Sequence, residues 1–190
     1  MTELKDIKAF AFDVDGIFTD GSVLAMPDGD LLRTFNAKDS FAVRMAWMNG
    51  FPVGIITGGC SESILNRFKM LGVETENIYM LSRNKIVDLE HFCKRNNLTL
   101  DQVAFAGDDV PDIPALKAAG LGICPADAVE EVKQASDIVS EEPGGKRFVR
   151  DLIERTLRAQ GKWKFDPHGS WACLYPDHLA AFADKTGKNV

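Results

Sequence analysis

The sequence has few cysteines, and their arrangement predicts neither a disulfide framework nor a zinc site. A zinc site would need clustered cysteine or histidine ligands, and a disulfide framework would need a denser set of cysteines. The chain contains no CxxC pair and no Cys/His cluster, and its four cysteines are widely spaced, at Cys60, Cys93, Cys124 and Cys173. We therefore expect free thiols.

Long apolar runs are also absent. No stretch approaches the roughly 20 apolar residues that a membrane span needs. The first residues, Met1–Asp6, lack the charged and apolar regions of a signal peptide. We therefore expect a cytoplasmic protein with no membrane partner. The 28 acidic residues outnumber the 22 lysines and arginines, and the resulting net charge of −6 argues against nucleic acid as a partner.

The 190 residues alternate between strand-like and helix-like segments, which indicates βαβ units and a parallel sheet in one α/β domain. Strand-like runs occur at Ile7–Phe12, Pro52–Ile56, Val103–Ala106, Leu121–Cys124 and Asp137–Val139. Helix-like segments occur at Asp39–Asn49, Ser61–Leu71, Lys85–Asn96, Pro111–Ala119, Ala128–Gln134 and Arg147–Gln160. The Pro27-Asp28-Gly29 turn predicts a projecting β-hairpin at about residues 17–36.

Two carboxylates directly follow the first apolar run. Asp13 and Asp15 stand two residues apart, and Gly16 comes next. Ligands of open α/β sheets bind at the carboxyl ends of the strands, and a period of two points both side chains the same way. Two like charges held so close are costly unless a cation or a proton lies between them, and Mg²⁺ suits carboxylates. An acidic surface turn is the plainer alternative.

Three further segments place polar groups after a strand or at a helix start. Thr57-Gly58-Gly59 offers a hydroxyl and glycine amides that can bind phosphate, although such a turn is more often a plain connection. Lys85 begins a helix, where a cation is unfavourable unless an anion shares the site, and a solvated lysine is the alternative. Gly107–Asp112 holds three carboxylates, more than one helix cap needs, which indicates a metal ligand among them.

These motifs together resemble those of the haloacid dehalogenase superfamily of phosphotransferases, from residue 7 to about 160. The family's DxDG begins at Asp13, its Ser or Thr after a strand is Thr57, its lysine is Lys85, and its GDDxxD is Gly107–Asp112. The resemblance implies a Rossmann-like, doubly wound parallel sheet with helices on both faces.

The same resemblance assigns roles to individual residues. Asp13 would be the nucleophile that attacks phosphorus, and Asp15 the general acid/base. Thr57 and Lys85 would bind the phosphoryl oxygens during transfer. Mg²⁺ would be held by Asp13, Asp108 and the backbone carbonyl of Asp15.

The spacing leaves no room for the cap domain that most relatives insert. With Phe35–Asp39 and the Gly144-Gly145 turn, this capless plan resembles the family of 3-deoxy-D-manno-octulosonate 8-phosphate (KDO 8-phosphate) phosphatases. That resemblance implies a Mg²⁺-dependent phosphomonoesterase of lipopolysaccharide biosynthesis. It also implies a cytoplasmic homotetramer whose sites are completed by neighbouring subunits. Residues 1–161 would form the phosphatase domain, and 162–190 a tail that can pack on a neighbouring subunit.

Sugar recognition is assigned by resemblance as well. Lys38 and Asp39 would contact the sugar acid near the mouth of the site. Arg150 and the Gly144-Gly145-Lys146-Arg147 turn would supply positive charge for its carboxylate. Thr57, Gly58 and Lys85 complete the substrate-binding set. For Lys38, Asp39 and Arg150, an ordinary solvated helix residue is an equal alternative.

Two departures from the family pattern leave the substrate open. The chain has Asp39-Ser40 where the family usually has Asp-Gly, and Gly144-Gly145-Lys146-Arg147 where it has Gly-Gly-x-Gly. A related group that acts on nine-carbon 2-keto-3-deoxy sugar acid 9-phosphates shows Asp-Ser at the first place, so that substrate competes. A catalytically silent module that binds a sugar nucleotide or regulates a partner enzyme is a further alternative. The complete set of acids and lysine argues against it.

Overall fold

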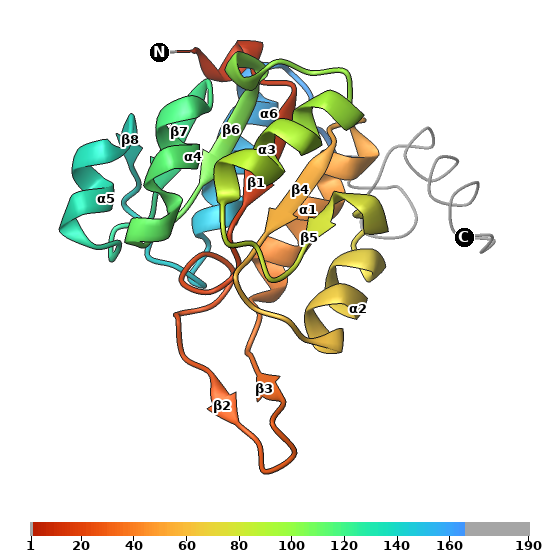
Figure 1. Cartoon of the computed structure of the whole chain (residues 1–190). Coiled ribbons are helices and arrows are strands. Elements are labelled where there is room, and N and C mark those ends of the chain that lie inside the picture. The colour runs from red at the N-terminus through yellow and green to blue at the C-terminus, as the bar shows by residue number, and fades with distance from the viewer. Residues whose placement is uncertain (1, 166–190) are drawn as a thin grey trace.

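The structure, a computed structural model that describes residues 2–165, is built around a six-stranded parallel sheet (Figure 1). The strands are β1 (Ala9–Phe12), β4 (Val53–Ile56), β5 (Ile78–Tyr79), β6 (Val103–Ala106), β7 (Leu121–Cys124) and β8 (Ile138–Val139). They lie in the order β5-β4-β1-β6-β7-β8, and every neighbouring pair is parallel. The chain thus winds outward in both directions from β1, as in doubly wound folds.

Helices cover both faces of the sheet. Along β1 the side chains alternate, so that Phe10 and Phe12 join one core cluster and Ala9 and Ala11 the other. The phenylalanine side packs against α1 (Ala37–Met48), α2 (Glu62–Met70) and α6 (Phe148–Ala159). The alanine side packs against α3 (Lys85–Arg95), α4 (Ile113–Ala118) and α5 (Glu130–Ala135). The predicted fold class is therefore confirmed.

The ends of the elements shift from the predicted ones by one or two residues. Strands β6 and β7 match at both ends, and Ser61 lies just before α2, where its hydroxyl accepts from the backbone N–H of Ser63 at 3.1 Å. The two-residue strand β5 was not predicted. The predicted helix 111–119 begins as the 3₁₀ turn η4 (Val110–Asp112) and continues as α4.

A two-stranded hairpin, β2 (Leu24–Ala25) and β3 (Leu31–Leu32), projects from the end of the sheet at which β1 ends (Figure 1). Its turn contains Gly29 at a φ of 91°, a conformation that favours glycine. In residues 2–165, only this hairpin and α1 lie between β1 and β4. Between β4 and α3 lie α2, the 3₁₀ turn η2 (Thr75–Asn77) and β5, so neither place holds a cap domain.

The end of the described chain packs on the domain itself. Trp163 is 8% exposed. Its ring meets Phe41 edge to face at 6.4 Å, and the guanidinium of Arg150 lies 4.5 Å from its centroid. Packing thus continues past the predicted boundary at residue 161, and the predicted tail lies outside the described residues from 166 onward. Phe41 is half-buried in this contact.

None of the helices in residues 2–165 has the length and apolar character that a bilayer crossing requires.

Candidate active site

The carboxyl ends of β1, β4 and β6 and the start of α3 meet at one pocket of about 380 Å³. The structure thereby brings together the four motifs, which are far apart in the sequence. The pocket is lined by Asp13, Asp15, Thr57, Gly58, Gly59, Ser82, Arg83, Lys85, Asp109, Pro111 and Asp112.

Lys85 joins two buried carboxylates in this pocket. Its Nζ lies 2.9 Å from Asp13 Oδ2 and 2.5 Å from Asp112 Oδ1. Asp112 is fully buried, and its Oδ2 accepts from the backbone N–H groups of Asp108 and Asp109 at 3.0 and 3.2 Å. These two acids offset the unfavourable position of a lysine at a helix N-terminus. Asp112 therefore fixes Lys85 and shapes the loop that carries Asp108, while exposed Asp109 caps η4.

Two acids of the site, Asp13 and Asp108, hold their protons more tightly than ordinary carboxyls. Burial and the charge of Asp112 raise the pKa of Asp13 to about 6, against the opposing effect of Lys85. Burial, with Asp13 and Asp112 nearby, raises the pKa of Asp108 to about 7. Burial alone would lower the pKa of Lys85, but the charges of Asp13 and Asp112 outweigh it and raise that pKa. The pocket thus holds more negative charge than its lysine balances.

The site has the features of a divalent cation site. Asp13, Asp108 and Asp112 bring carboxylate oxygens within 4.8 Å of one another. Asp13 Oδ1 is buried without a hydrogen-bond partner in the described part of the chain, which is costly unless another group binds it. Asp108 can approach only because Gly16 has no side chain, since a Cβ there would lie 1.8 Å from Asp108 Oδ2. Oxygen donors around an unpaired oxygen fit Mg²⁺.

This cluster differs in part from the predicted ligand set of Asp13, Asp15 and Asp108. Asp13 and Asp108 come together as expected. The third carboxylate is Asp112, which Lys85 already engages. The carboxylate of Asp15 turns instead to Arg33 and leaves only its backbone carbonyl for a metal, which is the role the resemblance implied.

Thr57 follows β4 and is 1% exposed. Its Oγ1 accepts from the backbone N–H of Gly59 at 3.1 Å, which leaves its O–H to donate into the pocket. Backbone hydrogen bonds tie this turn to the segment before Lys85, with the N–H of Ser82 donating to the Thr57 carbonyl at 2.9 Å. The phosphate-binding turn and the lysine therefore keep a fixed relation.

Two arginines of the site were not predicted. Arg33 follows β3 and its guanidinium binds both carboxylate oxygens of Asp15. Arg83 is exposed and lines the pocket two residues before Lys85. Neither belongs to a motif, so no local pattern marks them. The only signal in the sequence for Arg83 was its position two residues before the motif lysine.

The structure does not bring the three predicted sugar-binding residues outside the motifs to this pocket. Asp39 is fully buried, and its carboxylate accepts from the backbone N–H groups of Arg147 and Arg150 at 3.2 and 2.8 Å. It therefore caps the start of α6 instead of facing a sugar. The Arg150 side chain pairs with Glu154 at 2.6 Å and covers Trp163. Lys38 is exposed in the first turn of α1.

The Gly144-Gly145 turn packs against the loop that follows Asp13 and Asp15. A Cβ on Gly144 would lie 1.8 Å from the Gly16 carbonyl oxygen, and the N–H of Gly145 donates to the Ile17 carbonyl at 2.9 Å. We expected this turn to supply positive charge for the substrate. Lys146 does line a second hollow of about 310 Å³ beside Asn36.

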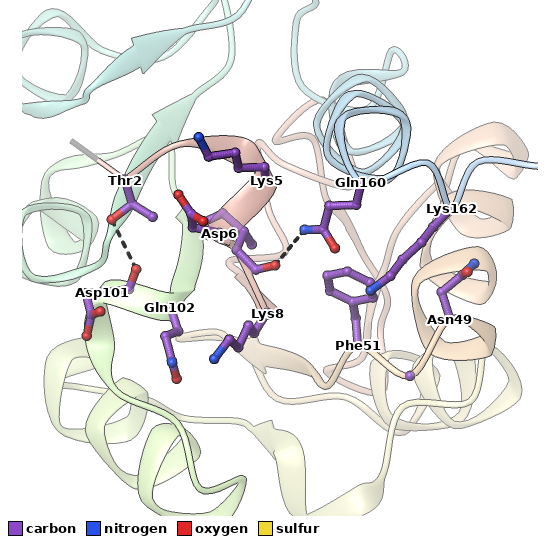
Figure 2. Close-up of a pocket in the computed structure, with 12 residues that line it drawn as sticks. Thr2, Lys5, Asp6, Lys8, Asn49, Phe51, Asp101, Gln102, Gln160 and Lys162 are labelled. Carbon is purple, nitrogen blue, oxygen red and sulfur yellow. Dashed lines mark hydrogen bonds between the residues drawn. The ribbon is translucent and has the colours of Figure 1, made fainter.

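A hollow larger than this pocket, of about 570 Å³, lies at the opposite end of the sheet, and Figure 2 shows the residues that line it. Its side chains include lysines and the exposed acids Asp6 and Asp101. The dashed contacts in Figure 2 join Thr2 to the Asp101 carbonyl and Gln160 to the Ile7 carbonyl, and both stabilise the scaffold. This hollow holds no buried pair of acids, so its volume does not make it the reactive site.

Comparison with known proteins agrees with this geometry. A model of haloacid dehalogenase-like hydrolases matches residues 74–143. The 3-deoxy-D-manno-octulosonate 8-phosphate phosphatase KdsC of Salmonella typhi is 31% identical over 162 residues, 85% of each chain. KdsC of Haemophilus influenzae is 32% identical over 164 residues, 84% of this chain and 88% of its own.

Solved structures give the same answer. The KDO 8-phosphate phosphatase of Moraxella catarrhalis, crystallised with a magnesium ion, a phosphate ion and KDO, has a TM-score of 0.80 and 32% identity. The match covers 84% of this chain and 91% of that one. Relatives that are 31% and 32% identical over 85% and 84% of this chain show its family: it belongs to the haloacid dehalogenase-like hydrolases and, among them, to the KDO 8-phosphate phosphatase family.

Proposed function

We propose that the protein is a Mg²⁺-dependent phosphomonoesterase that hydrolyses KDO 8-phosphate to KDO and phosphate through an aspartyl phosphate on Asp13. The observation that carries the proposal is the buried Asp13, paired with Lys85 through Oδ2 and left with an unpartnered Oδ1 beside Asp108. An ion pair with a purely structural role would not leave one carboxylate oxygen buried and unpaired. A nucleophile next to a metal ion needs such a free oxygen.

The described residues account for both displacement steps. Asp13 attacks phosphorus and the bond from phosphorus to the sugar oxygen breaks, while Asp15 gives its proton to that oxygen. Water then attacks the aspartyl phosphate and gives a proton back to Asp15, which frees Asp13 and phosphate. Asp13, Asp108 and the backbone carbonyl of Asp15 would hold a Mg²⁺ ion, which would supply positive charge between carboxylate and phosphate.

Two donors hold the phosphoryl oxygens where negative charge concentrates. Lys85 Nζ has three protons, and its two carboxylate partners leave one for a phosphoryl oxygen. The Thr57 hydroxyl and the Gly58 amide belong to a turn that lines the same pocket. Preorganised donors of this kind act without reorganisation during the reaction.

The acid sugar is recognised at the rim. Arg83 is exposed there, and its guanidinium suits a carboxylate at the far end of the substrate. The nine-carbon alternative rested on Asp39-Ser40. Ser40 is buried, donates to the Asn36 carbonyl at 2.9 Å and binds the Arg67 side chain, so it is not part of the pocket lining. This departure therefore gives no support to a longer sugar.

Release of phosphate tests the function directly. The purified protein should hydrolyse KDO 8-phosphate with Mg²⁺, faster than a nine-carbon acid 9-phosphate, and Asp13→Asn should be inactive on both. Faster turnover of the nine-carbon substrate would reassign the sugar. Equal, negligible rates for wild type and Asp13→Asn on every sugar phosphate would instead favour a silent binding module.

We also propose that the protein works in the cytoplasm, in lipopolysaccharide biosynthesis, as a homotetramer that assembles through its hairpins. Support comes from the apolar side chains that the hairpin exposes, namely Val23, Leu24, Met26 and Leu32. Contact between subunits would cover the capless sites. Sedimentation should show a tetramer, and Leu24→Asp should dissociate it. A compact monomer with full activity would contradict this assembly.

A further inference from the structure

The hairpin delivers one buried cation to the active site. Arg33, the residue after β3, has a side chain that is 2% exposed. Its Nε donates to Asp15 Oδ1 at 2.7 Å and its Nη2 to Asp15 Oδ2 at 2.9 Å. A bidentate pair of this kind fixes the plane of the carboxylate, which a lysine cannot do.

The position of the guanidinium is fixed on two further sides. Its Nη1 donates to the Leu31 carbonyl at 2.8 Å, so the side chain folds back onto the strand that carries it. Gly59 provides the space on the opposite side, because a Cβ there would lie 2.9 Å from Arg33 Nη2. The absence of a side chain at Gly59 therefore allows Arg33 to stand between the phosphate-binding turn and Asp15.

We propose that Arg33 is a positioning residue for proton transfer, acting through Asp15. This proposal rests on the function proposed above. When Asp15 gives its proton to the leaving sugar oxygen, the carboxylate that remains is held by Arg33. It then takes a proton from the attacking water in the same orientation. Arg33 itself exchanges no proton and forms no bond to phosphorus.

The pair also links the hairpin to the reaction. Asp15 stands three residues after the end of β1, and Arg33 reaches it from an arm that projects away from the domain. A shift of the base of this arm moves the Asp15 carboxylate relative to Asp13. Displacements of about 1 Å in such groups cost on the order of 100-fold in rate.

A double-mutant cycle on KDO 8-phosphate tests the proposal. Asp15→Asn should lower kcat by about 10²–10⁴-fold, and Arg33→Met by on the order of 100-fold. The double variant should be no slower than Asp15→Asn alone, because Arg33 has nothing left to position. Arg33→Lys keeps charge and packing but loses the bidentate contact, so it should recover only part of the rate.

Leaving-group dependence separates this role from a structural one. p-Nitrophenolate leaves without a proton, so Arg33→Met should retain the initial burst of p-nitrophenol from p-nitrophenyl phosphate and slow only the later steady state. Multiplicative losses in the double variant, a change in KM alone, or an equal loss of burst and steady state would overturn the proposal. Full activity of Asp15→Asn would overturn the acid/base assignment itself, and activity of Asp13→Asn the proposed function.

Discussion

The two ends of the sheet differ in the burial and pairing of their charged side chains. At the carboxyl ends of the strands, Asp13, Lys85 and Asp112 are buried and paired at 2.5 to 2.9 Å. At the amino ends, Lys5 and Lys8 are exposed around the larger hollow of Figure 2. Buried charges are expensive to desolvate, whereas exposed ones contribute little.

This difference teaches how to recognise the reactive end. The larger hollow is solvated, and the charged side chains that line it are exposed, so water stabilises their charges. The smaller pocket keeps three acids beside one lysine at a cost in stability, as functional sites commonly do. If the comparison is right, substitutions at the two ends should differ in kind as well as in size.

The largest effect is expected for Asp13→Asn. It removes the nucleophile without changing its volume, so turnover should fall on the order of 10⁶-fold, as for other covalent mechanisms. Stability should hold or rise, because one buried like charge is gone. Phosphate release and thermal unfolding measure both quantities, and a variant that unfolds easily would show that Asp13 is mainly structural.

Lys85→Met should lose both activity and stability. Without the ammonium group, Asp13 and Asp112 face each other uncompensated in a buried site, which costs about 3 kcal/mol or more. Urea unfolding at pH 8 gives the difference in the free energy of unfolding. Adding Asp112→Asn should restore part of that stability but not the activity. A double variant as unstable as Lys85→Met would contradict this account.

Mg²⁺ should stabilise the protein through the acids at the carboxyl ends. At a concentration about 100 times its Kd, the ion should add roughly 2.7 kcal/mol to the free energy of unfolding. Asp108→Asn should abolish most of this gain while the variant stays folded. Thermal unfolding with and without the ion measures it, and an equal gain in Asp108→Asn would move the metal site elsewhere.

Without metal, stability should fall as pH rises from about 4 to 7. The folded protein holds protons on Asp13 and Asp108, whose pKa values are raised to about 6 and 7, while an unfolded aspartate releases its proton near pH 4. The folded state therefore binds more protons within this window, and the two groups together should cost several kcal/mol of stability across it. Mg²⁺ should remove the trend, and denaturant midpoints across this range check both.

Lys8→Gln, at the opposite end, should have the smallest effect. Lys8 is exposed, so the change should alter stability by at most about 0.5 kcal/mol and leave kcat unchanged. The same urea and phosphate assays serve as its test. A large loss of activity would show that the larger hollow takes part in the reaction, which would break the comparison.

The sequence was sufficient for the fold because the elements are local. Apolar runs such as Val103–Ala106 and a capped helix start at Ser61 follow from neighbouring residues. The catalytic motifs could also be placed, since the carboxyl ends of parallel strands meet. Two-residue β5 escaped because its stability comes from its partner strand β4.

The rest depended on contacts between distant residues. Arg33 reaches Asp15 across 18 positions, and Asp39 binds the start of α6 across 108 and 111 positions. Nothing near Asp39 distinguishes a helix cap from a sugar ligand, because a carboxylate serves both purposes. Arg150 was likewise predicted to bind an anion, but its side chain forms an ion pair with Glu154 and packs over the ring of Trp163.

The backbone contact between Gly16 and Gly144 restricts which sequences can form this site. The two loops are in direct backbone contact, so a side chain at position 144 is excluded on steric grounds, whatever the reaction requires. In a library randomised at residue 144 and selected only for soluble, folded protein, glycine should dominate the survivors. Selection for catalysis would then change nothing there, because the scaffold already demands the residue that the reaction needs.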